Sequence, residues 1–379
     1  MFPIIDLAGG AFERGRIHGA QARARVERSI ATYARLFAFC GIDWRGAQAL
    51  GARYRDPIGA FDAELLAEIE GIAAGAGRHV NEILALNART EILPPTYPGE
   101  PHPDWQGIAA ANVAAGVPDW GECTAIAVRP AASATGGTLL AQNWDWLGAQ
   151  RGALVLARIR ASDGSHCLTL TEAGMLAKIG LNERGFGVCL NILRSQHDGK
   201  QPGVPVHVLL RALLKRSGVK DAIAFASTLS FGGSSNILCA DAAGDAAALE
   251  LAPSGLYVVP AAGGTLCHTN HFLAPAAQSR EATLAPSLSS IPRLERAHAL
   301  VGALPAKLGV ADLQRMLRDE ADGYRAISRE PDPALPEEAR IESVASVIME
   351  LAAGVMHVAP DVPSRTAYAP VRLRSLAVA

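Results

Sequence analysis

The chain has 379 residues, of which 49% are hydrophobic, and its formal net charge is −2. This balance argues against nucleic acid or an anionic membrane as a partner, and no apolar run approaches the roughly 18 residues of a membrane span. The six cysteines form no CxxC pair, which argues against a zinc ribbon or a disulfide scaffold, so we expect a cytoplasmic protein whose cysteines are mostly small buried side chains.

The N-terminal quarter of the chain is predicted to be helical. Residues 6–92 are rich in alanine, and their apolar positions recur at intervals of three and four. The run PPTYPGEPHP (94–103) then excludes both a helix and a central strand. We therefore expect a long loop from Pro94 to Glu122, and long loops inside compact proteins are usually functional or disordered.

From Cys123 onward the pattern is one of short β-prone runs, interrupted twice by helical stretches. The predicted strands are residues 123–129, 138–145, 153–160, 166–171, 185–192, 236–240, 246–251, 256–260, 265–270, 343–351 and 354–359. The predicted helices are residues 205–215, 219–229, 292–301 and 310–320. Runs of strands beside runs of helices favour an α+β layered fold over a parallel βαβ sheet.

Common catalytic and phosphate-binding motifs are absent from the sequence, including GxSxG, GxxxxGK[ST] and HExxH. The nearest metal-like cluster is CHTNH, with Cys267, His268 and His271. Thiolate and imidazole bind zinc, but two histidines three apart on an extended stretch point to different faces. We expect these side chains to be structural, with no metal bound, and a metal site is the weaker alternative.

Cys123 opens an apolar strand directly after the Pro-rich loop. A cysteine attacks as its thiolate and needs a base, yet no histidine has a spacing that identifies it as that base. Cleavage of the preceding peptide bond would free an α-amine with a pKa of roughly 7.7–8, suited to accept the proton of the thiol. A buried cysteine at a strand edge is the alternative, and the pattern alone favours it.

Four stretches together carry a resemblance to a known family. They are CTAIAV (123–128), LAQNWDW (140–146), TEAGMLAKIGLN (171–182) and CHTNHF (267–272). The set resembles the acyl-coenzyme A:isopenicillin N (6-aminopenicillanic acid) acyltransferase family, a cysteine branch of the N-terminal-nucleophile hydrolases. The resemblance covers residues 123–272 and the late strand 343–349, whereas residues 1–120 match mainly in helical character.

This resemblance implies an αββα four-layer sandwich, with two antiparallel sheets between helical layers and a helical N-terminal segment. It also implies that the precursor cuts itself between Glu122 and Cys123. Residues 1–122 would then form the helical segment and linker, and residues 123–379 the hydrolase chain, together making one structural domain. The best-known member of the family has glycine before its cysteine, so Glu122 is a departure from the pattern.

The resemblance also implies roles for single residues. Cys123 is the nucleophile, and its freed amine is the base. Asp145 holds the α-ammonium and sets its pKa. Asn270 donates an amide N–H to the oxyanion, an interaction worth about 3 kcal/mol.

Further roles that the resemblance implies lie around these residues. Thr124 and Asn143 support the site from the neighbouring strand positions. The run EAGMLAKIG (172–180) resembles the substrate-side strand and turn of the family, although a plain β-turn also explains its glycines. No cofactor is implied.

The predicted function is an autoproteolytically activated amidohydrolase, peptidase or acyltransferase that acts on a small N-acyl amide or peptide through a thioester. An acyl-coenzyme A or an amine as co-substrate stays open, as do the acyl specificity and the oligomeric state. The alternative is an uncleaved, non-catalytic binding protein of the same fold, since a fold does not fix a function. The joint presence of Cys123, Asp145 and Asn270 speaks against that alternative.

Overall fold

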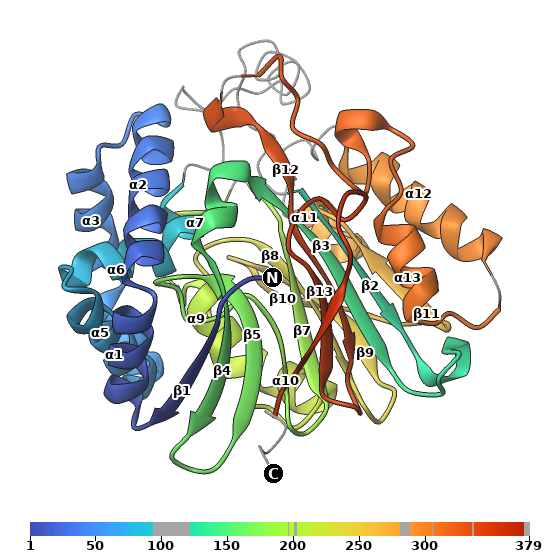
Figure 1. The fold of residues 1–379 in the computed structure, drawn as a ribbon, viewed down its shortest axis with the longest axis horizontal. Coiled ribbons are helices and arrows are strands. Elements are labelled where there is room, and N and C mark those ends of the chain that lie inside the picture. The colour runs from blue at the N-terminus through green and yellow to red at the C-terminus, as the bar shows by residue number, and fades with distance from the viewer. Residues whose placement is uncertain are drawn as a thin grey trace.

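The computed structural model describes residues 1–93, 122–195, 197–200, 203–280, 289–304, 306–335 and 337–374. Two β-sheets lie face to face between two layers of helices (Figure 1). The order of strands is β1-β4-β5-β6-β7-β8-β9-β10 in one sheet and β11-β2-β3-β12-β13-β14 in the other. The α+β class and the αββα layering expected from the sequence are confirmed.

The strands of the eight-stranded sheet are β1 (Ile4–Gly9), β4 (Leu154–Ala161), β5 (His166–Glu172), β6 (Ile179–Asn182), β7 (Phe186–Ile192), β8 (Ser235–Asp241), β9 (Ala246–Ala252) and β10 (Gly255–Pro260). Those of the six-stranded sheet are β11 (Thr265–His268), β2 (Glu122–Val128), β3 (Leu139–Leu147), β12 (Ile341–Glu350), β13 (Val355–Ala359) and β14 (Ala369–Arg372). Nearly all neighbouring strands run antiparallel, and β1 with β4 is the parallel pair among the described strands.

One helical layer covers the eight-stranded sheet and the other covers the six-stranded sheet (Figure 1). The first layer contains α1 (Ala11–Gln21), α2 (Arg23–Phe39), α3 (Trp44–Ala52), α4 (Arg55–Phe61), α5 (Ala63–Ala76), α6 (Val80–Asn87), α7 (Arg89–Ile92), α9 (Val206–Leu213) and α10 (Val219–Ala226). The second contains α12 (Ser290–Ala303) and α13 (Val310–Leu317), and α11 (Pro275–Arg280) precedes it. In the described part of the chain, no helix combines the length and apolarity needed to cross a membrane.

The layered arrangement explains why the strands read as nearly continuous apolar runs. All nine residues of β3 are buried, because each sheet lies between the other sheet and a helical layer. In β2 the side chains alternate between two environments. Cys123, Ala125 and Ala127 belong to the core between the sheets, whereas Ile126 and Val128 pack with the residues of α12 and α13.

The structure corrects three details of the sequence reading. Residues 6–9 lie in the strand β1 and not in a helix. The strand was missed because only Ile5 and Leu7 point inward, and two alternating positions are too few to indicate a strand. Since β1 joins β4 in parallel, the eight-stranded sheet is not wholly antiparallel. The short elements β6, β14 and α11 were not predicted. The predicted loop lies outside the described residues, except that Glu122 begins β2.

Candidate active site

Cys123 is the second residue of β2, and its side chain faces the core between the two sheets. Its cross-strand partner is Trp144 of β3. Only 3% of Cys123 is exposed, and this burial raises the pKa of the thiol. The nearby charge of Asp145 raises that pKa further, whereas Lys178 and Arg293 lower it. The thiol therefore needs a base before it can attack at neutral pH.

Asn270 holds the backbone nitrogen of Cys123. Its Oδ1 accepts a hydrogen bond from the Cys123 N–H at 2.7 Å and another from Arg293 Nη2 at 3.0 Å. Because a guanidinium only donates, these contacts fix which end of the amide faces Cys123. The Nδ2 atom points away and donates to the carbonyl of Ile192 at 2.9 Å. In the uncut chain Asn270 thus acts on Cys123 as an acceptor, and its role as oxyanion donor stays a prediction.

Arg293 of α12 is a site residue that the sequence reading missed. It is fully buried, and its Nη1 donates to the Cys123 carbonyl at 2.8 Å and to Thr124 Oγ1 at 2.9 Å. Together with the bond to Asn270, one guanidinium joins Cys123, its neighbour in β2 and the amide that holds the Cys123 nitrogen. No motif marks this arginine, since it stands in an ordinary helix 170 residues after Cys123.

Two asparagines of the opposite sheet complete the hold on Cys123. Asn191 Nδ2 donates to the Cys123 carbonyl at 3.0 Å, and Asn236 Nδ2 donates to Asn191 Oδ1 at 2.9 Å. The carbonyl of Cys123 therefore receives hydrogen bonds from Arg293 and from Asn191. Both asparagines lie on strands and were not predicted, because an amide on a strand gives no signal of its partner in another sheet.

Asp145 of β3 lies opposite Glu122 in the strand register. Its carboxyl group is 1% exposed, and Ser343 Oγ donates to Oδ1 at 2.6 Å. Oδ2 is buried and has no hydrogen-bond partner among the described residues. Burial raises the pKa of Asp145 to about 7, although Arg293 and Ser343 favour the charged form. The Asp145 carboxyl group can therefore be neutral or charged near pH 7.

Thr124 and Asn143 face each other across β2 and β3. Thr124 Oγ1 accepts a hydrogen bond from Arg293, so it touches a group that also contacts Cys123. Asn143 Nδ2 donates to the carbonyls of Leu317 and Ile327, at 2.8 and 2.7 Å. Thr124 thus shares a partner with Cys123, whereas Asn143 anchors the outer layer near α13.

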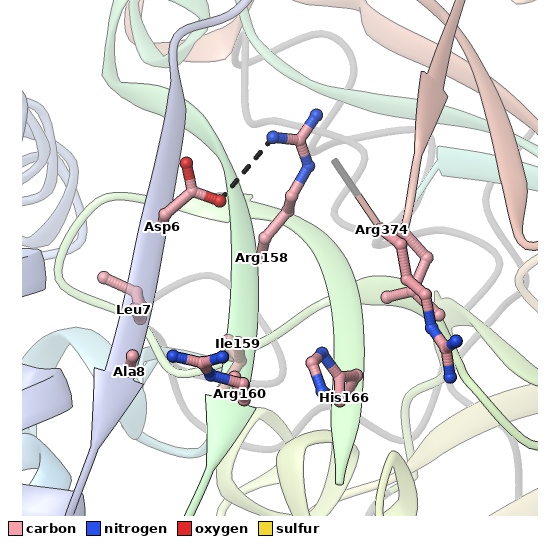
Figure 2. A pocket seen from close by; sticks show the side chains of 9 residues that line it. Asp6, Leu7, Ala8, Arg158, Ile159, Arg160, His166 and Arg374 are labelled. Carbon is pink, nitrogen blue, oxygen red and sulfur yellow. Dashed lines mark ion pairs between the residues drawn. The ribbon is translucent and has the colours of Figure 1, made fainter. Parts of the chain in front are cut away.

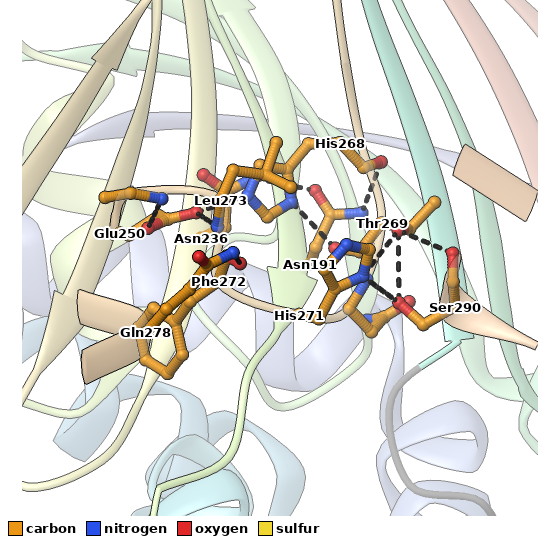
Figure 3. A network of polar contacts seen from close by, with 12 residues as sticks. Asn191, Asn236, Glu250, His268, Thr269, His271, Phe272, Leu273, Gln278 and Ser290 are labelled. Carbon is orange, nitrogen blue, oxygen red and sulfur yellow. Dashed lines mark hydrogen bonds and ion pairs between the residues drawn. The ribbon is translucent and has the colours of Figure 1, made fainter. Parts of the chain in front are cut away.

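The CHTNH segment forms the polar network of Figure 3. His268 Nε2 lies 2.9 Å from Glu250 Oε1, and His271 Nδ1 lies 2.7 Å from Ser290 Oγ. The Ser290 hydroxyl also accepts from the Asn270 N–H at 2.8 Å. The two imidazoles thus engage separate partners, and Cys267 packs in the apolar cluster under α12 and α13. Among the residues with described positions, no group of three His, Cys, Asp or Glu side chains has the arrangement of a metal site. The network positions the loop that carries Asn270.

A second polar cluster lies on the thiol side of β2. Lys178 directly precedes β6, and its Nζ lies 3.7 Å from the centroid of the Trp144 ring and 4.0 Å from Glu172 Oε2. Arg89 Nη2 lies 3.4 Å from the same carboxylate oxygen. Burial would raise the pKa of Glu172, but Arg89 and Lys178 lower it to about 2. The sequence reading singled out the 172–180 run without assigning a role to Lys178.

A surface hollow of about 400 Å³ lies at the β1 edge of the eight-stranded sheet (Figure 2). Asp6, Arg158, Arg160, His166 and Arg374 line it. Arg158 Nη1 lies 3.6 Å from Asp6 Oδ1. The described lining of this hollow includes no residue of the site around Cys123.

Comparison with known proteins agrees with the resemblance read from the sequence. Residues 133–358 match the model of the family described as acyl-coenzyme A:6-aminopenicillanic acid acyl-transferase. The match includes Asp145, Lys178, Asn270 and Arg293, and it begins ten residues after Cys123. The acyl-coenzyme A:6-aminopenicillanic-acid-acyltransferase 40 kDa form of Emericella nidulans is 32% identical over 209 residues, which are 54% of this chain and 51% of that protein. The match thus spans about half the length of this curated relative.

Two solved structures that match this chain are more distant in sequence. Penicillin V acylase from Agrobacterium tumefaciens superposes with a TM-score of 0.44 at 13% identity, over 63% of this chain and 83% of that chain. A mutant of conjugated bile acid hydrolase from Clostridium perfringens gives a TM-score of 0.46 at 11% identity, over 66% and 92% of the two chains. On the strength of the family match over residues 133–358, the chain belongs to the acyl-coenzyme A:6-aminopenicillanic acid acyl-transferase family.

Proposed function

We propose that this chain cuts itself between Glu122 and Cys123 and then acts as an N-terminal cysteine amidohydrolase or acyltransferase. Its substrate would be a small N-acyl amide or peptide. The observation that carries the proposal is that hydrogen bonds fix both the backbone nitrogen and the carbonyl of Cys123. Asn270 Oδ1 accepts from its nitrogen at 2.7 Å, and Arg293 and Asn191 donate to its carbonyl. A residue held in this way stays in place when the peptide bond before it is broken.

After processing, the α-amine of Cys123 is the base. An unperturbed α-amine has a pKa of roughly 7.7–8, so a large fraction is unprotonated near neutral pH. Asn270 Oδ1 keeps one amine hydrogen, which directs the nitrogen lone pair. Asp145 stabilises the ammonium that forms when the amine takes the thiol proton. The site thus needs no histidine.

Turnover then proceeds through a thioester. The Cys123 sulfur attacks the carbonyl carbon of the substrate, and the π electron pair moves to the oxygen. The carbon–nitrogen bond breaks, and the leaving amine takes the proton from the α-ammonium. Water or a second amine attacks the thioester, its proton returns through the α-amine to the sulfur, and the acyl group leaves as an acid or a new amide.

We assign the oxyanion to Asn270, as the resemblance implies. Its Nδ2 carries two hydrogens, of which one goes to the Ile192 carbonyl. The second is the donor available to a substrate oxygen once residue 122 has left the site. Removing one donor of this kind typically costs about 3 kcal/mol of transition-state stabilisation.

The acyl acceptor decides between hydrolysis and transfer, because both pass through the same thioester. The Emericella nidulans relative carries acyl-coenzyme A and 6-aminopenicillanic acid in its name. An acyl-coenzyme A donor and an amine acceptor are therefore the co-substrates to include beside simple N-acyl amino acids and peptides.

The experiment is to trap the acyl-enzyme. Processed protein is mixed with N-acyl p-nitroanilides or an acyl-coenzyme A, quenched in acid and digested for mass spectrometry, with C123A as the control. We expect the acyl mass on the peptide that begins with Cys123 and none in C123A. An added amine that yields a new amide identifies a transferase, whereas free acid alone identifies a hydrolase. Turnover without acylation of Cys123 would contradict the proposal.

A further inference from the structure

The first cut poses a problem that the proposed function leaves open. In the uncut chain the nitrogen of Cys123 is a peptide nitrogen, and it donates its only hydrogen to Asn270. A peptide nitrogen is not a base, so the α-amine that serves later turnovers is not available for the processing step. Burial raises the pKa of the Cys123 thiol, so the thiol does not ionise at neutral pH without help. Another group must accept its proton.

The side chain of Lys178 lies on the same face of the sheet as this thiol. Cys123 and Trp144 are paired across β2 and β3, and both face the core between the sheets. Lys178 Nζ lies 3.7 Å from the centroid of the Trp144 ring. The charges of Lys178 and of the Cys123 thiol also act on each other, since each shifts the pKa of the other. Asp145 directly follows Trp144 in β3, so its side chain points to the opposite face of the sheet, where it contacts Ser343 of β12.

The charges around Lys178 favour release of its proton. Lys178 is 2% exposed, and its one ion pair among the described residues, with Glu172, has a separation of 4.0 Å. The Glu172 carboxylate already accepts hydrogen bonds from Arg89, Tyr33 and Gln150. The buried cluster thus contains two cations, Arg89 and Lys178, but only one carboxylate, Glu172. One positive charge is not neutralised, which favours the loss of a proton from Lys178.

The titratable groups that face Lys178 come from several elements: Cys123 of β2, Glu172 of β5, Arg89 of α7 and His207 of α9. Burial, followed by repulsion from Arg89, lowers the pKa of Lys178 to about 7, although Glu172 and Cys123 attract its charge. Burial lowers the pKa of His207 well below its ordinary value, so His207 is neutral and adds no charge at pH 7. Lys178 is therefore unprotonated in a substantial fraction of molecules at neutral pH.

We propose that Lys178 is the general base of the self-processing step, a role that rests on the proposed cut at Glu122–Cys123. The thiol proton of Cys123 passes to Lys178 Nζ, and the sulfur attacks the carbonyl carbon of Glu122. The π electron pair moves to the carbonyl oxygen. When it returns, the bond between that carbon and the Cys123 nitrogen breaks, and the nitrogen takes the proton from Lys178 and becomes the α-amine. Water then opens the thioester, giving the Glu122 carboxylate and the free thiol.

Lys178 and the α-amine of Cys123 therefore act as bases in different steps. Lys178 serves once, while the Cys123 nitrogen is still part of a peptide bond. The new α-amine, which is attached to the same residue as the thiol, is the base of every later turnover. The loss of Lys178 should therefore affect processing far more than amide hydrolysis by the cut enzyme.

The test uses K178M and K178R in the full-length chain. A second version of each protein keeps the N-terminal elements β1 to α7 and carries, directly before Cys123, the recognition sequence of a site-specific protease that leaves Cys123 as the new N-terminus. A general base contributes about 10²–10⁴-fold to rate, so we expect both variants to process at least about 100-fold more slowly than the wild type. Arginine keeps the charge but does not lose its proton in proteins, so K178R should not rescue processing.

The protease-cut variants show whether the variants fold. We expect cut K178R to hydrolyse N-acyl amides, because the α-amine is then the base. The processing rate of the wild type should rise with pH to a plateau with a midpoint near 7, well below the ionisation range of a buried thiol. If K178R processes at the wild-type rate, Lys178 is not the base of the processing step, and the proposed function is unaffected. D145N is made in parallel, and loss of processing in D145N with retention in K178R would assign the proton to Asp145.

Two further outcomes keep this inference apart from the proposed function. A wild type that stays whole but hydrolyses amides after the protease cut overturns processing and the role of Lys178, and leaves the amidase chemistry standing. A wild type that processes at the same rate as K178R overturns this inference and leaves the proposed function intact.

Discussion

Asn270 Oδ1 lies 2.7 Å from the backbone nitrogen of Cys123, although 147 residues separate the two along the chain. The same oxygen accepts from Arg293, so the amide is locked with its oxygen toward the nucleophile. This relationship gives Asn270 two tasks in the proposed reaction. Its oxygen holds the nitrogen that becomes the base, and the second hydrogen of its Nδ2 is the proposed donor to the oxyanion.

The first prediction concerns these two tasks. N270A removes both, so kcat/KM of the processed enzyme should fall by about 10²–10³-fold, as for other oxyanion donors. N270D keeps an oxygen for the amine but removes the donor and adds a charge that raises the pKa of the α-amine, so its pH–rate profile should also move to higher pH. Steady-state kinetics on an N-acyl p-nitroanilide measures both effects. A loss below about threefold in N270A would contradict the assignment.

The second prediction concerns Arg293. Removing its guanidinium leaves buried acceptors on Cys123, Thr124 and Asn270 with fewer donors. We expect R293M to lower the free energy of unfolding by about 1.5–3 kcal/mol, the usual contribution of hydrogen bonds from a buried charged group. Urea unfolding should be measured in the C123A background, which keeps every sample uncut.

The matched control for R293M is R296M on the same helix. Arg296 pairs with Asp319 near the surface, with 40% of its side chain exposed. Pairs of this kind contribute roughly 0–1 kcal/mol, so R296M should lie close to the parent. Equal losses in the two variants would mean that the contacts of Arg293 at the site carry no special weight.

The third prediction concerns the pH dependence of stability. Burial raises the pKa of Asp145 from 3.8 to about 7, so between these values the folded state keeps a proton that the unfolded state has lost. The contribution of this group to stability is thus fully present below pH 4 and is lost as pH rises through about 7, by about 4 kcal/mol at most.

Asn does not ionise, so D145N should gain stability relative to its parent as pH rises from 4 to 8. Urea unfolding of C123A and of C123A/D145N at both pH values gives this double difference, with processing absent from both. A difference that stays constant or changes in the opposite direction would mean that Asp145 has an ordinary pKa in the folded chain.

The fourth prediction concerns thiol reactivity. All six cysteines are buried and unpaired with one another, and burial raises the pKa of Cys40 to about 11 and those of Cys239 and Cys267 to about 12. Processed protein at pH 7.5 should therefore react with iodoacetamide only at Cys123, where the α-amine accepts the thiol proton. Peptide mapping identifies the modified cysteine. Labelling of Cys40, Cys239 or Cys267 at the rate of Cys123 would contradict the effect of burial on the pKa of these thiols.

Much of the fold could be predicted from local patterns. The strands β2, β3 and β12 are long apolar runs, and such runs are recognisable because both faces of each sheet are buried. The strand β1 was missed because its two inward residues, Ile5 and Leu7, sit in a segment that leads directly into the helix α1. Its assignment depends on pairing with β4, about 150 residues away, which no local pattern contains.

The residues of the candidate site also differ in whether local sequence patterns could identify them. Cys123, Asp145 and Asn270 stand in short motifs and could be named from the sequence, and the structure brings them together. Arg293, Asn191 and Lys178 could not, because their importance arises from contacts made only in the folded chain. A buried arginine in a helix and a lysine before a strand look ordinary until the fold places the first against the Cys123 carbonyl and the second over the Trp144 ring.

In the proposed reaction Cys123 becomes an N-terminal nucleophile by self-cleavage. Intact mass spectrometry of purified wild type beside C123A tests it most directly. We expect two chains in the wild type, of 122 residues and of 257 residues (379 minus 122), and one uncut chain in C123A. A wild type that remains a single chain of 379 residues, or a C123A that is cut at the same bond, would contradict it.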